Sequence, residues 1–338
     1  MRAMPPLYLV EQGAKLSHDG HRLVVTKDGE TLASVPLIHV SEVLIFGNVQ
    51  VTTPVLKTLL SRGVDVVFLT EDGRHYYGRL VGPPTKYGEL RLWQYERARQ
   101  AAFGLALAQR FVGGKLRNMR TLLQRYNREM NDPEVAEAVE QLAALAERAP
   151  RTQNLHSLQG VEGKGSALYF GVFKRLFKAD WGFQARRRRP PTDPLNVLLS
   201  FGYTLLAHAL EAAVNLVGLD PYIGFLHTTE YGRPSLALDL MEEFRPLVVD
   251  SVVLRACNGG IVRMEDFAPG DSEERPIVWS EEGRKRFIQE FEARLALSFL
   301  HPRWGERVTY RRCFELQVRH LADCLKQGIT DYQPFIVR

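Results

Sequence analysis

The residues from Gly224 to Pro246 combine side chains that can bind a cation or carry a proton. A loop bearing His227 leads through a turn into a predicted helix, for which Ser235 is the expected N-cap. Asp239 and Glu242 are three residues apart, so their carboxylates emerge on one face of that helix. Neighbouring carboxylates cost stability unless something neutralises them. The apolar residues around them favour a site, and a solvated helix face is the alternative.

A second acidic position, Glu162, stands among glycines further upstream. Apolar residues between 155 and 173 recur at helical spacing, yet Gly160, Gly163 and Gly165 each weaken a helix by about 1 kcal/mol relative to alanine. Small residues beside one acid let a partner helix or a phosphodiester backbone approach closely. The stretch therefore fits either a helix-packing notch or a site with Glu162 at the point of closest approach.

The densest positive charge is a run of four arginines that ends in a double proline: Arg186, Arg187, Arg188 and Arg189. Four successive side chains cannot share one helix face, so we expect an extended loop that contacts a phosphate backbone. Lys164, close to Glu162, is a further predicted phosphate contact. A solvated charge patch is the alternative interpretation. The net charge of +5 is only a weak indication of polyanion binding.

The elements that would position these side chains fall into two parts. Alternating apolar residues and Asp-Gly turns predict a β-rich part, with one helix from Thr53 to a stop at Gly63. The predicted strands cover 7–11, 15–17, 22–26, 30–36, 43–46, 65–69 and 76–81. We predict a multidomain α and β protein, with a β-sandwich-like dimerisation domain at 1–82, a linker at 83–90 and a larger all-α catalytic domain at 91–338.

Helical spacing continues through that second part. Gly113-Gly114 and Asp132-Pro133 are expected to separate helices, and 267–278 is expected to be an exposed loop. The predicted helices cover 90–108, 134–148, 194–218, 246–258, 280–300 and 309–327.

Composition favours an intracellular enzyme. Apolar residues make up 45% of the chain and charged residues 25%, and no apolar run reaches the 18 residues of a membrane span. The three cysteines lack CxxC spacing, which argues against a disulfide framework or a thiolate zinc site. No motif of a serine or P-loop enzyme is present, so the sequence offers no protein nucleophile.

Four blocks in this order resemble the CRISPR-associated adaptation integrase family ("Cas one"): GVEGKGSALYF, RRRRPPTDPLNVLLSFGYTLL, GFLHTTEYGRPSLALDLMEEFRPLVVD and YQPF. The resemblance covers nearly the whole chain. By position, the metal ligands of the family match Glu162, His227 and Glu242, and Asp239 matches the accompanying acid. At the position of Glu242 the family more often has Asp. The longer glutamate side chain is a conservative departure that would change the distance from the backbone to the metal slightly.

The resemblance implies a cytoplasmic, metal-dependent DNA integrase and endonuclease of antiviral defence. Such an enzyme joins the 3′-hydroxyl ends of short foreign DNA to the CRISPR repeat by transesterification. The family forms a homodimer through the β domain, and a small partner ("Cas two") bridges two dimers. Two carboxylates and an imidazole suit Mg²⁺ or Mn²⁺, although zinc accepts similar ligands. A metal-dependent repair DNase without strand joining and a non-catalytic DNA-binding scaffold remain alternatives.

Overall fold

The computed structural model describes residues 5–73, 76–82, 88–227 and 232–337 of the chain. The chain divides into two compact units, Met1–Thr85 and Lys86–Arg338. Helix α2 begins at Gly88, so the end of the predicted linker 83–90 is helical, and the rest of that linker, 83–87, lies outside the described residues.

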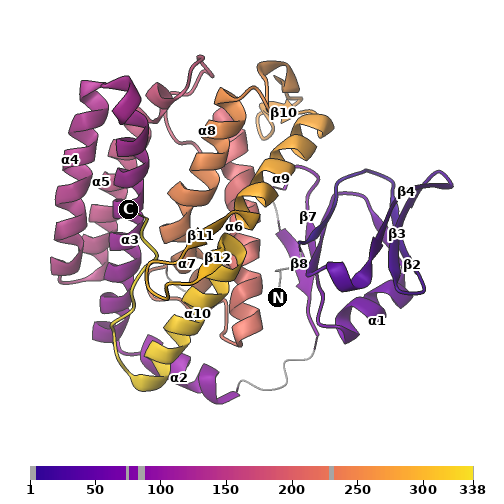
Figure 1. Ribbon diagram of the computed structural model, residues 1–338, viewed down its shortest axis with the longest axis horizontal. Helices are drawn as coiled ribbons and strands as arrows, with labels where there is room; N and C mark the ends of the chain where they lie inside the picture. Colours follow the sequence, from indigo (N-terminus) through magenta and orange to yellow (C-terminus); the bar gives the residue numbers. More distant parts are fainter. Residues whose placement is uncertain (1–4, 74–75, 83–87, 228–231, 338) are drawn as a thin grey trace. The chain divides into compact units, whose positions relative to one another are not determined.

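In its described residues, the N-terminal unit has two four-stranded sheets, one α-helix and a short 3-10 helix, η1 (Leu37–His39) (Figure 1). One sheet has the order β1-β5-β7-β8, with β8 antiparallel to its neighbour, and the other has the order β4-β3-β2-β6, with β6 parallel to β2. The elements are β1 (Leu7–Leu9), β2 (Lys15–Asp19), β3 (Arg22–Lys27), β4 (Glu30–Pro36), β5 (Glu42–Phe46), β6 (Gln50–Val51), α1 (Thr53–Ser61), β7 (Asp65–Leu69) and β8 (Tyr76–Leu80).

Both sheets and α1 contribute to one hydrophobic core. Leu16 and Val25 point into it from one sheet, Ile45 and Val66 from the other, and Leu59 from the helix. All seven predicted strands are present with small shifts of their ends. The sequence analysis missed β6, because a two-residue strand shows no alternation of apolar and polar residues.

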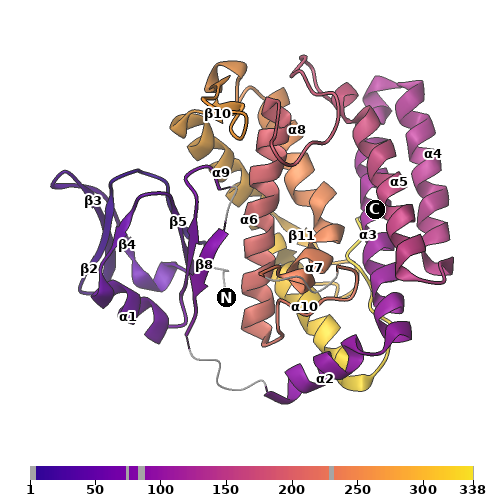
Figure 2. The same ribbon diagram turned by 180° about the vertical axis from the view of Figure 1, so that it is seen from behind.

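The second unit is mainly helical, and Figure 2 shows its helices from behind. Helices α3, α4 and α5 pack against one another, α3 also contacts α7, and α6 packs on α7 and α10. The elements are α2 (Gly88–Ala98), α3 (Ala101–Met130), α4 (Pro133–Arg148), α5 (Leu155–Phe173), α6 (Pro194–Val217), α7 (Ser235–Arg245), η4 (Pro246–Asp250), α8 (Ser251–Asn258), β9 (Phe267–Pro269), β10 (Ile277–Trp279), α9 (Glu281–Ala296), β11 (Ser298–Leu300), β12 (Arg307–Thr309) and α10 (Tyr310–Gln327).

Two short antiparallel strand pairs correct the prediction that this unit is all-α. Strands β9 and β10 form at the two ends of the predicted loop at 267–278, and the cross-strand rings of Phe267 and Trp279 stack at a centroid distance of 5.9 Å. The helix predicted at 280–300 ends at Ala296, and β11 then pairs with β12.

Helix α3 runs through Gly113-Gly114, where the sequence predicts a break. A Cβ atom on Gly114 would lie 2.6 Å from the Cβ atom of Pro334, so this glycine allows a close approach of chain segments. By contrast, Asp132-Pro133 does separate α3 from α4, and the Asp132 side chain caps α4 by accepting hydrogen bonds from the N–H groups of Glu134 and Val135.

Helix α7 begins one residue earlier than predicted, at Ser235, and its last residue, Arg245, leads directly into further helical turns. Pro234 occupies the N-cap position, and the Ser235 hydroxyl donates back to the Arg233 carbonyl instead of capping the helix. At its other end α7 passes through the π-helical turn η4 into α8. That wider turn accommodates Pro246, which has no N–H for an α-helical hydrogen bond.

Helix α6 is long and apolar enough to cross a membrane by length and composition. In the structure 67% of its most apolar window is buried inside the protein. It packs against α7 and α10, which is the position of a core helix.

Candidate active site

Helix α7 is buried on nearly every side, yet it carries charged residues. Asp239, Glu242, Glu243 and Arg245 are each at most 7% exposed. Buried charges are costly unless they are paired or hydrogen-bonded. The hydrogen bonds and ion pairs of these four side chains therefore indicate the role of the helix.

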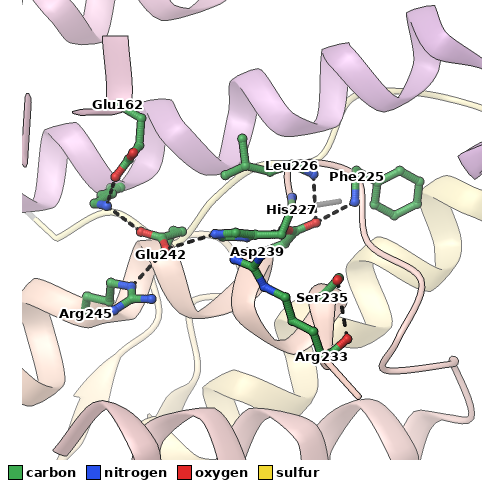
Figure 3. Close-up of polar contacts among 10 residues, drawn as sticks. Glu162, Phe225, Leu226, His227, Arg233, Ser235, Asp239, Glu242 and Arg245 are labelled. Atoms are coloured by element: carbon green, nitrogen blue, oxygen red, sulfur yellow. Dashed lines mark hydrogen bonds and ion pairs between the residues drawn. The ribbon is translucent and has the colours of Figure 1, made fainter. Parts of the chain in front are cut away.

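Asp239 holds the loop that carries His227 (Figure 3). Its Oδ2 atom accepts hydrogen bonds from the N–H groups of Phe225 (2.5 Å) and Leu226 (2.9 Å), and its Oδ1 atom accepts from the N–H of His227 (2.9 Å). A Cβ atom on Gly224 would lie 2.8 Å from Asp239 Oδ2. Only glycine at that position lets the loop approach the helix this closely.

The same carboxylate fixes the imidazole of His227. Its Nδ1 atom lies 2.7 Å from Asp239 Oδ1, and an ionised carboxylate only accepts hydrogen bonds, so Nδ1 carries the proton. The lone pair of Nε2 then points toward Glu242, whose Oε1 atom lies 3.9 Å away. This arrangement matches histidines that bind metals through one nitrogen and are oriented through the other.

Glu162 reaches the same place from α5. Its side chain is 28% exposed, whereas that of Glu242 is 3% exposed. The ammonium group of Lys115, from α3, contacts Glu162 Oε1 and lies 2.7 Å from Glu242 Oε2. One cation therefore joins the two carboxylates.

Glu242 also binds the guanidinium of Arg245, with a distance of 2.9 Å from Nε to Oε1. Burial alone would raise the pKa of Glu242, but the charges of Arg245 and Lys115 outweigh it and hold the pKa well below its usual range. The carboxylate is therefore ionised at neutral pH.

A second network ties α5 to the chain after α7. Arg245 lies over the ring of Tyr203 at 4.6 Å, and the Tyr203 hydroxyl donates to Asp250 (2.5 Å). Tyr169 of α5 donates to the other oxygen of Asp250 (2.8 Å). Burial raises the pKa of Asp250 to about 6, although both hydroxyl groups oppose that shift. These contacts fix α5, and with it Glu162, relative to the helix that carries Glu242.

The C-terminal segment that contains YQPF contacts α7 at Glu243. Glu243 accepts hydrogen bonds from the Tyr332 hydroxyl (2.8 Å), the Gln317 amide (3.2 Å) and the Phe335 N–H (2.7 Å). Asn118, one turn beyond Lys115 on α3, donates to the carbonyls of Glu243 and Phe335. Burial raises the pKa of Glu243 to about 8.

The glycines around Glu162 have two different roles. A Cβ atom on Gly165 would lie 2.2 Å from the Leu116 side chain, so Gly165 allows α5 to pack on α3. Gly160 and Gly163 have no atom within 4 Å of such a position. The packing interpretation thus holds for Gly165 only, and the surface of α5 is open at the other two glycines.

The four arginines do not form one group. Arg186 contacts the protein itself, since its guanidinium donates to Asn196 (2.8 Å) and Ser200 (3.1 Å). Burial lowers its pKa to about 10. This corrects the expectation that all four arginines are phosphate contacts. The others, Arg187, Arg188 and Arg189, are exposed, as is Lys164.

The donor atoms suit a hard divalent cation. Two carboxylates and an imidazole Nε2 converge, and Lys115 shows that a cation is accommodated between the carboxylates. Within the described ranges, no three His, Cys, Asp or Glu side chains already form a metal-binding group. Residues 228–231, which include part of the predicted turn, lie outside those ranges.

The sequence analysis missed two residues of this site. Arg245 is one turn from Glu242 and could have been recognised as its helical i, i+3 partner. Lys115 comes from a distant helix, and no local pattern identifies it.

Comparison with known proteins places this chain in a family. A family model described as CRISPR associated protein Cas1 matches residues 7–293. The CRISPR-associated endonuclease Cas1 3 of Thermus thermophilus is 42% identical over 334 residues, which cover 98% of this chain and 97% of that protein. The chain therefore belongs to the Cas1 family of CRISPR-associated proteins.

Solved structures share the fold over the whole chain. A chain of a Cas6-RT-Cas1–Cas2 complex matches with a TM-score of 0.83 and 25% identity, over 100% of this chain and 36% of that chain. A CAS1 protein from Thermotoga maritima matches with a TM-score of 0.81 and 23% identity, over 98% of this chain and 99% of that chain.

Proposed function

We propose that this protein is a metal-dependent DNA endonuclease and integrase of CRISPR adaptation. It joins the 3′-hydroxyl ends of short foreign DNA to the CRISPR repeat by transesterification. The observation that carries the proposal is that Glu162 and Glu242 meet at one internal cation, with His227 Nε2 3.9 Å from Glu242, in a Cas1-family chain. The Thermus thermophilus relative is named an endonuclease.

The proposed ligands are Glu162, His227 and Glu242, with Mg²⁺ or Mn²⁺ as the cofactor. When bound, such a cation polarises the scissile phosphate and stabilises the attacking and leaving oxygens. Asp239 keeps the proton on His227 Nδ1 and holds the loop in place. Arg245 keeps the Glu242 carboxylate ionised and oriented.

The attacking oxygen comes from the DNA or from water. All three cysteines are buried and unpaired, which does not favour a covalent thiol intermediate. Gly160 and Gly163 leave room for a phosphodiester on α5, the helix that carries Glu162. Exposed Lys164 is one turn from Gly160 on the same helix and supplies a positive charge to that surface.

The proposed partners are DNA, a second copy of the chain and a small Cas2 protein in the cytoplasm. Arg187, Arg188 and Arg189 are available for phosphate contacts. The matching solved assembly is a Cas1–Cas2 complex, which supports the Cas2 partner. We place the homodimer contact in the N-terminal unit. Light scattering tests this: the full chain should be dimeric, and a chain starting at Lys86 that remains dimeric would contradict the assignment.

The metal site is tested with conservative substitutions that keep side-chain shape. Glu162→Gln and Glu242→Gln should abolish Mn²⁺-dependent cleavage of duplex DNA, because an amide is a much poorer metal ligand than a carboxylate. Glu147→Gln, on the exposed face of α4, is the matched control and should cleave like the wild type. Unchanged cleavage by either site variant would remove that residue from the site. Absence of Mn²⁺ binding in calorimetry would favour a non-catalytic scaffold.

A further inference from the structure

Lys115 is a buried cation inside the candidate metal site. Its side chain is 4% exposed, and its ammonium group contacts Glu162 and lies 2.7 Å from Glu242 Oε2. Glu162 Oε1 also accepts a hydrogen bond from the Ser166 hydroxyl at 2.9 Å. The ammonium thus uses the same carboxylate oxygens that a divalent cation would need.

The charges in this cluster balance without a metal. The two glutamates carry two negative charges, while Lys115 and Arg245 carry two positive ones. Asp239 is engaged by His227 and by backbone N–H groups. A divalent ion added between the same oxygens would face an ammonium at contact distance, which is strongly unfavourable in a buried site. One of the cations must move.

Lys115 is the one that can move. Arg245 has a planar guanidinium held at Glu242, stacked on Tyr203, and Tyr203 is in turn fixed by Asp250. Lys115 has a compact charge on a flexible four-carbon stem, which can turn aside while its backbone stays in α3.

We propose that Lys115 is an internal counter-cation that the catalytic divalent metal displaces, and that the displaced ammonium then binds a phosphate of the DNA. This inference rests on the metal dependence proposed above. In the metal-free protein Lys115 keeps the two glutamates together. If the metal took over that role, the freed ammonium would lie next to Glu162, whose side chain is 28% exposed and so can be reached by bound DNA. Lys115 is then a further catalytic residue.

Calorimetric titration of the full-length protein with Mn²⁺ alone tests the displacement. Lys115→Met keeps the apolar stem and removes the competing charge, so Mn²⁺ affinity should increase by about tenfold or more. Lys164→Met removes a positive charge from exposed α5 without freeing either glutamate, and Mn²⁺ affinity should change less than about threefold. This control separates displacement from a general electrostatic effect.

Thermal unfolding gives a second measurement. Without metal, Lys115→Met should melt below the wild type, because Glu162 and Glu242 then repel each other. Mn²⁺ should raise its melting temperature more than that of the wild type. DNA cleavage by Lys115→Met should nevertheless fall, although the metal binds more tightly. Cleavage at the wild-type rate would overturn the phosphate role.

The outcomes distinguish this inference from the proposed function. If the wild type binds Mn²⁺ and Lys115→Met binds no more tightly than Lys164→Met, displacement is wrong while the metal dependence stands. If neither the wild type nor Lys115→Met binds Mn²⁺, the metal dependence itself is wrong. A crystal structure of the wild type soaked in Mn²⁺ gives a test that does not depend on a variant. Lys115 still bridging both glutamates beside a bound ion would overturn the inference.

Discussion

Replacing Asp239 by asparagine tests how the histidine of the site is positioned. The carboxylate accepts four hydrogen bonds, three from the backbone N–H groups of Phe225, Leu226 and His227 and one from His227 Nδ1. Asparagine has the same shape but offers only one acceptor oxygen. That oxygen can serve Phe225 and Leu226, and the amide NH₂ then faces two donors of His227.

The expected loss of stability follows from those two donors. Hydrogen bonds to a charged group contribute about 1.5–3 kcal/mol each, so the loss of two should lower the free energy of unfolding by about 3–6 kcal/mol. The imidazole can recover one bond by accepting at Nδ1. Its proton then moves to Nε2, and the nitrogen that faces Glu242 no longer has a free lone pair.

Urea unfolding and calorimetry with Mn²⁺ measure both consequences. Asp239→Asn should unfold at lower urea concentration than the wild type and bind Mn²⁺ about 10–100-fold more weakly, as is typical when a group that orients a metal-binding histidine is removed. Asp323→Asn, at an exposed position of α10, is the matched control and should change neither quantity. If Asp239→Asn keeps wild-type stability and wild-type Mn²⁺ affinity, the role given to Asp239 is wrong.

Two further predictions concern the buried acid behind the site and the exposed arginines. Burial raises the pKa of Glu243 to about 8 from its ordinary value of 4.5, so between these pH values the folded state holds a proton that the unfolded state has released. The free energy of unfolding of the wild type should therefore fall relative to that of Glu243→Gln as pH rises from 5 to 8, by up to about 1.4 kcal/mol per pH unit. Urea unfolding that gives the same difference between the two proteins at pH 5 and at pH 8 would contradict this prediction. Replacing Arg187, Arg188 and Arg189 together by alanine should weaken binding of all DNA sequences and reduce the slope of log affinity against log salt by about 1 for each phosphate that the variant no longer neutralises. An unchanged slope in fluorescence anisotropy would identify these arginines as a solvated patch.

Local patterns predicted most of the elements. In 22–26 buried and more exposed residues alternate, as expected for a strand with one face toward the core, whereas 65–69 is a short run of mainly apolar residues in a more deeply buried strand. Asp132-Pro133 marks a helix start through its side-chain cap. Gly113-Gly114 led to the wrong prediction of a helix break. Gly114 makes room for Pro334, which is more than 200 residues away in the sequence, and local rules do not detect such a contact.

The site could be predicted from the sequence where its residues lie close together along the chain. Asp239 and Glu242 share a helix, so their spacing places them on one face, and the turn before that helix brings His227 near; only the family resemblance joined these residues to Glu162. Neighbouring carboxylates require a neutralising positive charge, and the sequence analysis expected one. Its source, Lys115 on α3, is brought to the site by tertiary packing, so the local sequence does not identify it. For the same reason Arg186 could not be distinguished from its three exposed neighbours.

Strand transfer is the most direct test of the proposed integrase function. A short end-labelled duplex with free 3′-hydroxyl groups is incubated with repeat-containing DNA, Mn²⁺, the full-length protein and its Cas2 partner. We predict branched products in which the labelled strand is joined to the repeat, and their disappearance when the ends are dideoxy-terminated, while hydrolytic nicking continues. If the repeat is nicked but the labelled DNA never becomes joined to it, the protein is a metal-dependent DNase and the integrase assignment is wrong.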